Sequence, residues 1–190
     1  MGTIVTVSGV SGSGKTTLVD YLLSLSPKHH LVESVTTRGS RNRDRPGEFL
    51  HLSPDEFLSK EKQGKFLWVT PPIHGVRYGT LRESVGKALR SDSVSFMIIT
   101  IEYLQVLRDY VTYSARNITG LYIHSPGETI LRERLLKRGD SPNETEERIT
   151  DCRDWDTKAQ QTKTQPAIHF LRNEGTLEDF FLKARLLSIK

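Results

Sequence analysis

A glycine-rich octapeptide near the start of the chain has the composition of a phosphate-binding loop. Residues 9–16 read GVSGSGKT, which satisfies the pattern G-x-x-x-x-G-K-[ST] in full. Glycines allow such a loop to curl until its backbone N–H groups point at phosphate oxygens, and the following helix N-terminus adds positive potential. Lys15 would then reach the β- and γ-phosphates, and the Thr16 hydroxyl would join the shell of a bound Mg²⁺. The residues predicted to bind a nucleoside triphosphate are Gly9, Ser11, Gly12, Ser13, Gly14, Lys15, Thr16 and Thr17.

A second group of residues with the chemistry to handle phosphates is the set of arginines within residues 132–153, around a polar turn at 139–143. Small kinases need a movable, arginine-rich lid that closes over the donor phosphates and excludes water. GTPases usually carry an N-K-x-D motif, which this chain lacks. Motor ATPases usually end a later strand on an acid, whereas here the apolar run at 96–99 leads to Thr100, with Glu102 as the nearby acid. The pattern favours a small-molecule kinase that uses ATP.

Strand-like and helix-like segments alternate along the chain, which is typical of a parallel sheet covered by helices. Short β-branched or apolar runs predict five strands of one sheet, at residues 3–8, 31–37, 93–101, 118–123 and 167–171. Capping sequences predict helices that start near Ser53, Thr80 and Ser125, and a last helix that starts near Thr176. The expected fold is a single α/β domain of the P-loop kinase class, with a five-stranded parallel sheet flanked by helices.

Residues 38–80 depart from this alternation. They predict a short strand, a helix and a pair of strands around 66–70 and 76–78. We expect them to form a small acceptor-binding insertion that can move on the main sheet. The predicted core then comprises residues 1–37 and 81–190, with a helical lid at about 132–153.

Composition narrows the class of protein further. The 190 residues carry a net charge of +4 with both signs spread along the chain, which fits a protein that handles anions but does not establish nucleic acid as a partner. The single cysteine, Cys152, excludes a disulfide framework. Apolar runs are too short to cross a bilayer, and the N-terminus lacks a secretory pattern. We expect a cytoplasmic protein, in which the M-G-x-x-x-T start leads into a buried strand rather than serving as a myristoylation signal.

Further motifs, taken in order, resemble those of the guanylate kinase family. The acceptor-site signature of that family is similar to SVTTR at 34–38, followed by Arg41 and by PGE at 46–48. The stretches SPDEF at 53–57, QGKFL at 63–67 and YGT at 78–80 are also similar, as are LRERL at 131–135 and RG at 138–139. Asn173 resembles the asparagine that precedes the family's last helix. The resemblance covers nearly the whole chain and implies a nucleoside monophosphate kinase.

This resemblance implies a role for each matching side chain. The implied acceptor-binding residues are Ser34, Arg38, Arg41, Tyr78, Thr80 and Thr100, of which the arginines and the tyrosine grip the phosphate and the others face the base or sugar. The predicted catalytic residues are Lys15 of the phosphate loop together with Arg138 and Arg148, which the resemblance implies would clamp the transferring phosphoryl group, while Asn173 would lie near the adenine of ATP. Arginine forks match phosphate geometry, and phosphoryl transfer depends on positioning and charge stabilisation. The implied partner is a small phosphorylated acceptor, and a homodimer is left open.

Two positions depart from the family's pattern for reading guanine. Guanylate kinases supply a Glu just before the Y-G turn and an Asp at the end of the next strand. This chain has Trp68 or Val69 at the first position and Thr100 at the second. Its acceptor segment is also shorter than usual, and Phe49 stands in place of a phosphate-binding tyrosine. Because an unpaired buried polar group costs roughly 1–3 kcal/mol, the sequence does not settle specificity for GMP or dGMP.

Three alternatives remain at this point. Ribose 1,5-bisphosphate kinases, which look like shortened guanylate kinases, carry a turn similar to HGVRYG at 74–79. A kinase for another or a modified nucleoside monophosphate would use Trp68 to stack on the base. A non-catalytic guanylate-kinase-like interaction module would bind a partner peptide in the acceptor cleft, although such modules typically have a degraded P-loop.

Overall fold

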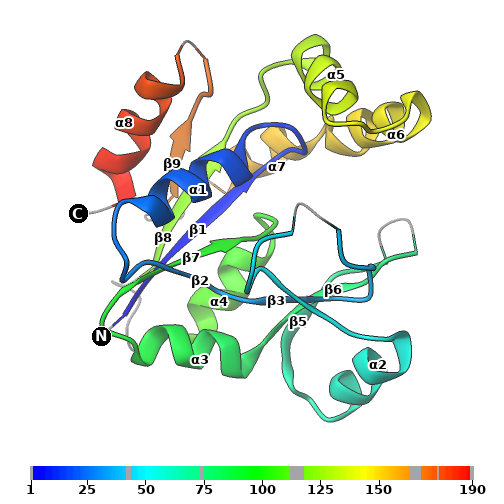
Figure 1. Ribbon diagram of the computed structural model, residues 1–190, viewed down its shortest axis with the longest axis vertical. Coiled ribbons are helices and arrows are strands. Elements are labelled where there is room, and N and C mark those ends of the chain that lie inside the picture. The colour runs from blue at the N-terminus through cyan, green and yellow to red at the C-terminus, as the bar shows by residue number, and fades with distance from the viewer. Residues whose placement is uncertain are drawn as a thin grey trace.

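A five-stranded parallel sheet runs through the centre of the molecule (Figure 1), in the order β2-β7-β1-β8-β9. The computed structural model describes residues 2–41, 44–72, 75–111, 118–162, 168–174 and 176–188. The strands of this main sheet are β1 (Thr3–Gly9), β2 (His30–Leu31), β7 (Val94–Ile98), β8 (Ile118–Ile123) and β9 (Ile168–Leu171). The predicted parallel sheet is therefore confirmed.

Helices cover both faces of this sheet, because its central strands are apolar on both sides. Successive residues of a strand point to opposite faces, so Val5 and Val7 of β1 join one core while Ile4 joins the other. Helices α1 and α8 pack in the first core, and α3, α4 and α7 pack in the second. Their bounds are α1 (Lys15–Ser24), α3 (Arg82–Arg90), α4 (Tyr103–Tyr110), α7 (Trp155–Gln161) and α8 (Leu177–Ser188).

A second sheet, in the order β4-β3-β6-β5, extends from one side of the main sheet. Phe57 of helix α2 stacks on Phe66 of this sheet, with ring centroids 4.6 Å apart, in a small core of its own. Ser53 caps α2 through the predicted capping box. We call residues 34–81 the small-sheet subdomain; its elements are β3 (Ser34–Thr36), β4 (Phe49–His51), α2 (Pro54–Lys62), β5 (Phe66–Val69) and β6 (Tyr78–Leu81).

The prediction of a single strand over 31–37 is wrong. His30–Leu31 pairs with β7 in the main sheet, whereas Ser34–Thr36 pairs with β4 and β6 in the second sheet. Both pieces are β-branched or apolar, and hydrogen-bonding partners distant in sequence decide which sheet each one joins. The second sheet thus begins before residue 38, and an acceptor-binding insertion over 38–80 stays a prediction.

Two predicted helix starts are also wrong. Thr80 lies within strand β6, whose pairing with β5 keeps it extended, and α3 begins only at Arg82. Helix α5 (Glu128–Lys137) begins after Gly127 rather than at Ser125, because Gly127 adopts a φ of +94° that a helix cannot continue through. Helix α6 (Pro142–Cys152), which lay unrecognised in the predicted lid, starts at Ser141 with a full capping box.

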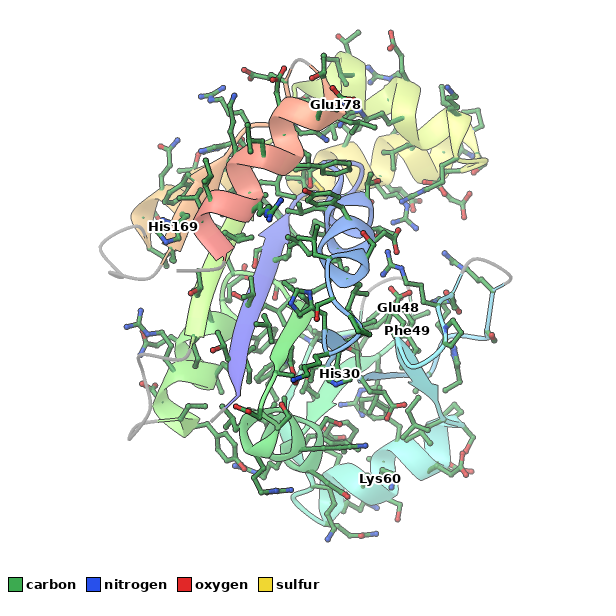
Figure 2. The ribbon with its side chains drawn as sticks, turned by 60° about the vertical axis from the view of Figure 1, so that its left-hand side comes forward. His30, Glu48, Phe49, Lys60, His169 and Glu178 are labelled. Carbon is green, nitrogen blue, oxygen red and sulfur yellow. The ribbon has the colours of Figure 1, made fainter. Side chains whose placement is uncertain are left out.

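The elements that carry the candidate site lie around the carboxyl end of β1, where parallel sheets place their ligands. In Figure 1, α5 and α6 stand beyond that end, and the small-sheet subdomain extends on the same side of the main sheet. Figure 2 marks the two ends of the molecule with Glu178 on α8 and Lys60 on α2. None of the helices among the described residues is both long and apolar enough to span a membrane. His74, in the turn that resembles ribose 1,5-bisphosphate kinases, lies outside the described residues.

Candidate active site

The loop between β1 and α1 has the backbone of a phosphate cradle. Gly9 and Gly14 adopt φ angles of +143° and +104°, which other residues rarely do. A Cβ on Gly14 would meet the amide nitrogen of Asn173 at 2.4 Å, so the close approach of that side chain also requires glycine. Asn173 Nδ2 donates to the Ser13 carbonyl at 2.9 Å. Asn173 therefore braces the loop from the end of β9, and its role near the adenine of ATP stays a prediction.

Lys15 lies beneath this loop with its ammonium held by the backbone. Its Nζ donates to the carbonyl oxygens of Gly9 and Val10, each at 2.8 Å. Burial, together with the nearby guanidinium groups of Arg138 and Arg148, lowers the pKa of Lys15 to about 8. A triphosphate would offer this ammonium charged oxygen acceptors, which favour the protonated form more than neutral carbonyls do.

The loop and the first turn of α1 also carry hydroxyl groups that could bind a phosphate and its metal ion. The Ser13 hydroxyl is fully buried and has no hydrogen-bond partner among the described residues. Buried polar groups are normally paired, so a phosphate oxygen fits this position. Thr16 and Thr17 are exposed at the start of α1. Mg²⁺ keeps several waters and binds phosphates plus one or two protein oxygens, which the Thr16 hydroxyl suits.

Helices α5 and α6 bring arginines to the same loop. Arg148 of α6 lies 3.5 Å from the Ser11 hydroxyl, and Arg134 of α5 donates to the Gly12 carbonyl at 3.2 Å. The turn between these helices contains Asp140, whose carboxylate pairs with Arg138 and, at 3.6 Å, with Arg148. Only 8% of the Asp140 side chain is exposed. Asp140 thus holds the two predicted catalytic arginines together, a role that its place in a polar turn did not reveal.

The loop after β3 arranges the predicted phosphate-binding arginines. Asp44 accepts two hydrogen bonds from the Arg38 guanidinium, at 2.8 and 3.0 Å, and one from the Arg41 backbone N–H at 2.8 Å. The Arg38 guanidinium holds the pKa of Asp44 below its usual value. It also lies over the Phe49 ring, 4.9 Å from the centroid. A phosphate can accept the same paired N–H groups that the carboxylate accepts here.

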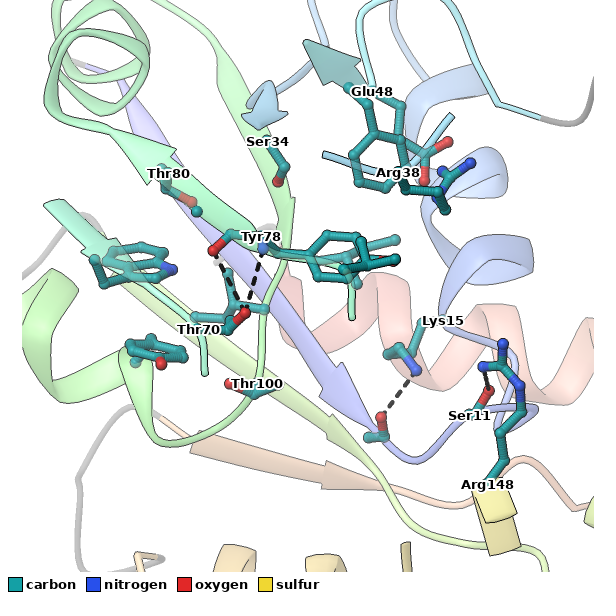
Figure 3. A pocket seen from close by; sticks show the side chains of 18 of the residues that line it. Ser11, Lys15, Ser34, Arg38, Glu48, Thr70, Tyr78, Thr80, Thr100 and Arg148 are labelled. Carbon is teal, nitrogen blue, oxygen red and sulfur yellow. Dashed lines mark hydrogen bonds between the residues drawn. The ribbon is translucent and has the colours of Figure 1, made fainter. Parts of the chain in front are cut away.

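A cavity of about 620 Å³ joins the phosphate loop to the small-sheet subdomain. Figure 3 shows Lys15, Ser11 and Arg148 at one end, with Thr80 at the other. The predicted residues that line the cavity are Gly9, Ser11, Lys15, Ser34, Arg38, Arg41, Tyr78, Thr80, Thr100 and Arg148. The other predicted residues lie beside it: Gly12, Ser13, Gly14 and Thr16 around the loop, Thr17 on α1, Asn173 behind the loop, and Arg138 against Asp140.

An aromatic pair forms part of the cavity wall in the small-sheet subdomain. Trp68 is 8% exposed and stacks on Tyr103 of α4, with centroids 5.4 Å apart and planes at 14°. The Tyr103 hydroxyl donates to the Val69 carbonyl at 3.1 Å, which fixes the ring. Of the two residues that could occupy the family's glutamate position, Trp68 faces the cavity. Tyr103 also lines it and had not been singled out from the sequence, because on its helix it reads as ordinary core.

Arg45 is a further residue that sequence reasoning missed. Its Nη2 donates to the Thr16 carbonyl at 2.8 Å, its Nε pairs with Asp20, and its Nη1 lies 3.8 Å from Glu48. The side chain is 16% exposed. In Figure 2, Glu48 and Phe49 lie on the side of the small-sheet subdomain that faces α1. Arg45 therefore ties the loop that carries Arg38 to the helix that follows the phosphate loop.

The P-loop follows the central strand, a pair of helices carries arginines to it, and the adjoining subdomain supplies more arginines. These features define a phosphotransferase of the P-loop kinase class. The guanylate kinase family model matches residues 1–166. The chain is 34% identical over 144 residues to a guanylate kinase of Helicobacter pylori, covering 75% of this chain and 67% of that protein. It is 31% identical over 141 residues to one from Thermotoga maritima, covering 73% and 65%. The chain belongs to the guanylate kinase family.

Solved structures support the same fold. A guanylate kinase from Anaplasma phagocytophilum superposes with a TM-score of 0.61 at 18% identity, covering 100% of this chain and 87% of that one. A gluconokinase from Sinorhizobium meliloti 1021 gives a TM-score of 0.53 at 18% identity, covering 98% and 93%. These likenesses concern the fold alone. They confirm the predicted fold class. The family match and the curated relatives confirm the predicted type of enzyme, a nucleoside monophosphate kinase-type phosphotransferase.

Proposed function

We propose that this protein transfers the γ-phosphoryl group of ATP to the phosphate of a nucleoside monophosphate, with GMP or dGMP as the acceptors that its relatives' names favour. The observation that carries the proposal is the continuous cavity, which has Lys15 and Arg148 in its wall together with Arg38 and Tyr78. Phosphoryl transfer requires little more from a protein than two phosphates held in line and neutralised. A single space with cations lining the places proposed for both phosphates meets that requirement.

At the donor end, the loop N–H groups and Lys15 would hold the β- and γ-phosphates of ATP. The Thr16 hydroxyl would join Mg²⁺, which neutralises charge on those phosphates when bound. Arg148 is close enough to Ser11 to meet the phosphoryl group in transfer. Arg138, paired with Asp140, would approach the same group if the lid closes further.

At the acceptor end, Arg38, Arg41 and Tyr78 would bind the phosphate of the monophosphate. For Arg38 this means exchanging the Asp44 carboxylate for a phosphate of similar geometry. The remainder of the acceptor would then extend toward Thr80 and Thr100. Cations on both sides reduce the repulsion between the two anionic groups that must meet.

An ADP-release assay with Mg·ATP tests this proposal against a panel of GMP, dGMP, AMP, CMP, UMP, dUMP, dTMP and ribose 1,5-bisphosphate. We expect ADP release that depends on a nucleoside monophosphate and disappears in Lys15→Ala. Turnover on the sugar bisphosphate alone would replace the proposal by a ribose 1,5-bisphosphate kinase activity. Silence across the panel with ATP still bound would point to a modified nucleotide, and absence of ATP affinity would point to a non-catalytic interaction module.

A further inference from the structure

The cavity wall formed by the small-sheet subdomain and the end of β7 is uncharged where it would meet the acceptor's base. The acidic residues that line the cavity, within the described part of the chain, are Glu48, Glu144 and Glu147. Glu48 lies beside Arg38 in Figure 3 and accepts the Arg45 backbone N–H at 3.2 Å. The other two belong to helix α6 of the predicted lid. None of these carboxylates therefore belongs to the part of the wall that contains Thr80 and Trp68.

The polar groups left in that part of the wall are hydroxyls and one indole N–H. Ser34, Thr80 and Thr100 line it, and Figure 3 shows all three away from Lys15 and Arg148. Thr70 lines it too, but its hydroxyl accepts the Tyr78 backbone N–H at 3.3 Å and serves to hold the two strand ends. The indole can donate one hydrogen bond and accept none.

These hydroxyls and the indole N–H determine which purine bases the cavity wall can distinguish. Guanine presents N1–H and a 2-amino group side by side, a pair of donors that a carboxylate accepts together with charge assistance. Hypoxanthine has the same N1–H and the same 6-oxo acceptor but lacks the 2-amino group. Neutral hydroxyls give weaker hydrogen bonds, roughly half as strong as charge-assisted ones, and each hydroxyl is equally able to donate. The 2-amino group therefore gains little from this wall.

We infer that this protein selects a nucleoside monophosphate by its phosphate and by the packing of a flat, neutral base near Trp68, and that it does not read the 2-amino group of guanine. The inference rests on the proposed function and specifies its substrate class: GMP and IMP serve as near-equivalent acceptors. Thr100 is a position at which a carboxylate would introduce discrimination, because it lines the cavity and carries only a neutral hydroxyl.

The test compares kcat/KM for GMP and IMP, with ADP release as the readout. We expect the two values to agree within about tenfold in the wild type, the scale of one neutral hydrogen bond. In Thr100→Asp the GMP-to-IMP ratio should rise by about tenfold or more, while the neutral isostere Thr100→Asn should leave it near the wild-type ratio. A wild-type ratio above tenfold, or a folded Thr100→Asp variant whose ratio does not move, overturns the inference.

A binding measurement keeps the inference testable apart from turnover. Both tryptophans of the chain line the cavity, so Trp155→Phe leaves Trp68 as the sole tryptophan reporter. Titration of this variant with GMP and with IMP should quench Trp68 emission with dissociation constants that agree within about tenfold. A wider gap, or unchanged emission while calorimetry shows GMP bound, contradicts the inference. If no monophosphate yields ADP yet both bind alike, the proposed function fails and the inference on recognition stands.

Discussion

The two ends of the cavity are built in different ways. At the donor end, the phosphate loop and the start of α1 form one contiguous stretch, residues 9–17, in which the backbone supplies most of the predicted phosphate contacts, and helix α6 adds Arg148. The acceptor end combines side chains from β3, the loop after it, β5, β6 and the segment after β7. Backbone contacts survive most substitutions outside the glycines, whereas an assembled wall changes with each side chain. A family can therefore keep its donor chemistry while the part that reads the acceptor drifts.

The largest expected effect is on the donor end. Lys15→Ala should lower kcat by about 10⁴-fold, because its ammonium would neutralise the phosphates that carry the transferring charge. Steady-state ADP release measures the loss, and circular dichroism checks that the fold is retained. Lys60→Ala on α2 is the matched control, since Lys60 is not among the residues that line the cavity and should keep wild-type turnover. Wild-type activity in Lys15→Ala would show that Lys15 does not act on the phosphates at the donor end.

The next effect falls on the lid. Arg148→Ala should lower kcat by about 10³-fold with the dissociation constant for ATP changed far less, because a transition-state arginine acts mainly on the barrier. Single-turnover kinetics and ATP titration separate the two quantities. Arg172→Ala removes an exposed arginine that pairs with Glu174 in a surface contact, and it should leave kcat unchanged. A decrease in kcat of less than tenfold in Arg148→Ala would show that Arg148 is a surface charge without a role in the transfer.

The link between the two ends is tested through Arg45. Arg45→Ala should lower kcat/KM for the acceptor on the order of 10²-fold while ATP affinity stays near wild type, because the loop that carries Arg38 loses its tie to α1. A double-mutant cycle with Asp20→Ala should be non-additive, since both variants break the same contact. Full additivity, or an equal loss of ATP affinity, would show that Arg45 does not position the acceptor loop.

The smallest effect concerns pH at the donor end. In the free protein the Lys15 pKa is lowered to about 8, so the charged form that binds phosphate is lost as pH rises through that value. Bound phosphate restores the proton, so the dissociation constant for ATP should rise about tenfold between pH 7 and pH 9. Calorimetry at pH 8.5 in buffers of different ionisation enthalpy should show uptake of most of one proton on binding. The dissociation constant for the acceptor should not depend on pH in this way. A dissociation constant for ATP that does not change with pH would contradict the role of Lys15 in binding phosphate.

Much of the fold could be read from periodicity and capping, and the errors have physical causes. Ser53 with Glu56 gave a correct helix start because all its partners lie within three residues. The same kind of pattern failed at Thr80 and at Ser125. Thr80 is held in a strand by pairing with Trp68, and the backbone N–H of Ser125 donates to the Asp156 carboxylate at 3.1 Å. At Thr80 a partner distant in sequence outweighs the local preference for a cap, and at Ser125 such a partner acts together with the positive φ of Gly127.

The site residues also differ in whether adjacent or distant parts of the chain set their positions. The backbone of the loop between β1 and α1 was predictable, because glycine torsions, a helix N-terminus and one lysine are all specified by adjacent residues, and its binding of phosphate stays a prediction. The roles of Arg45 and Asp140 were not, since each depends on a contact that forms only when separate elements pack. The choice between Trp68 and Val69 at the cavity wall was likewise open, because strand register sets which side chain faces inward.

The amino-acid sequence thus determined the donor chemistry, the class of fold and the order of its motifs, all of which follow from local spacing. Only the tertiary structure decided that Trp68, Tyr103 and Thr100 meet in one uncharged wall, and that Asp44 and Asp140 hold the arginines. Charge and hydrogen-bond partners depend on distance in space, and a chain brings such groups together only after its sheets have paired and its helices have packed.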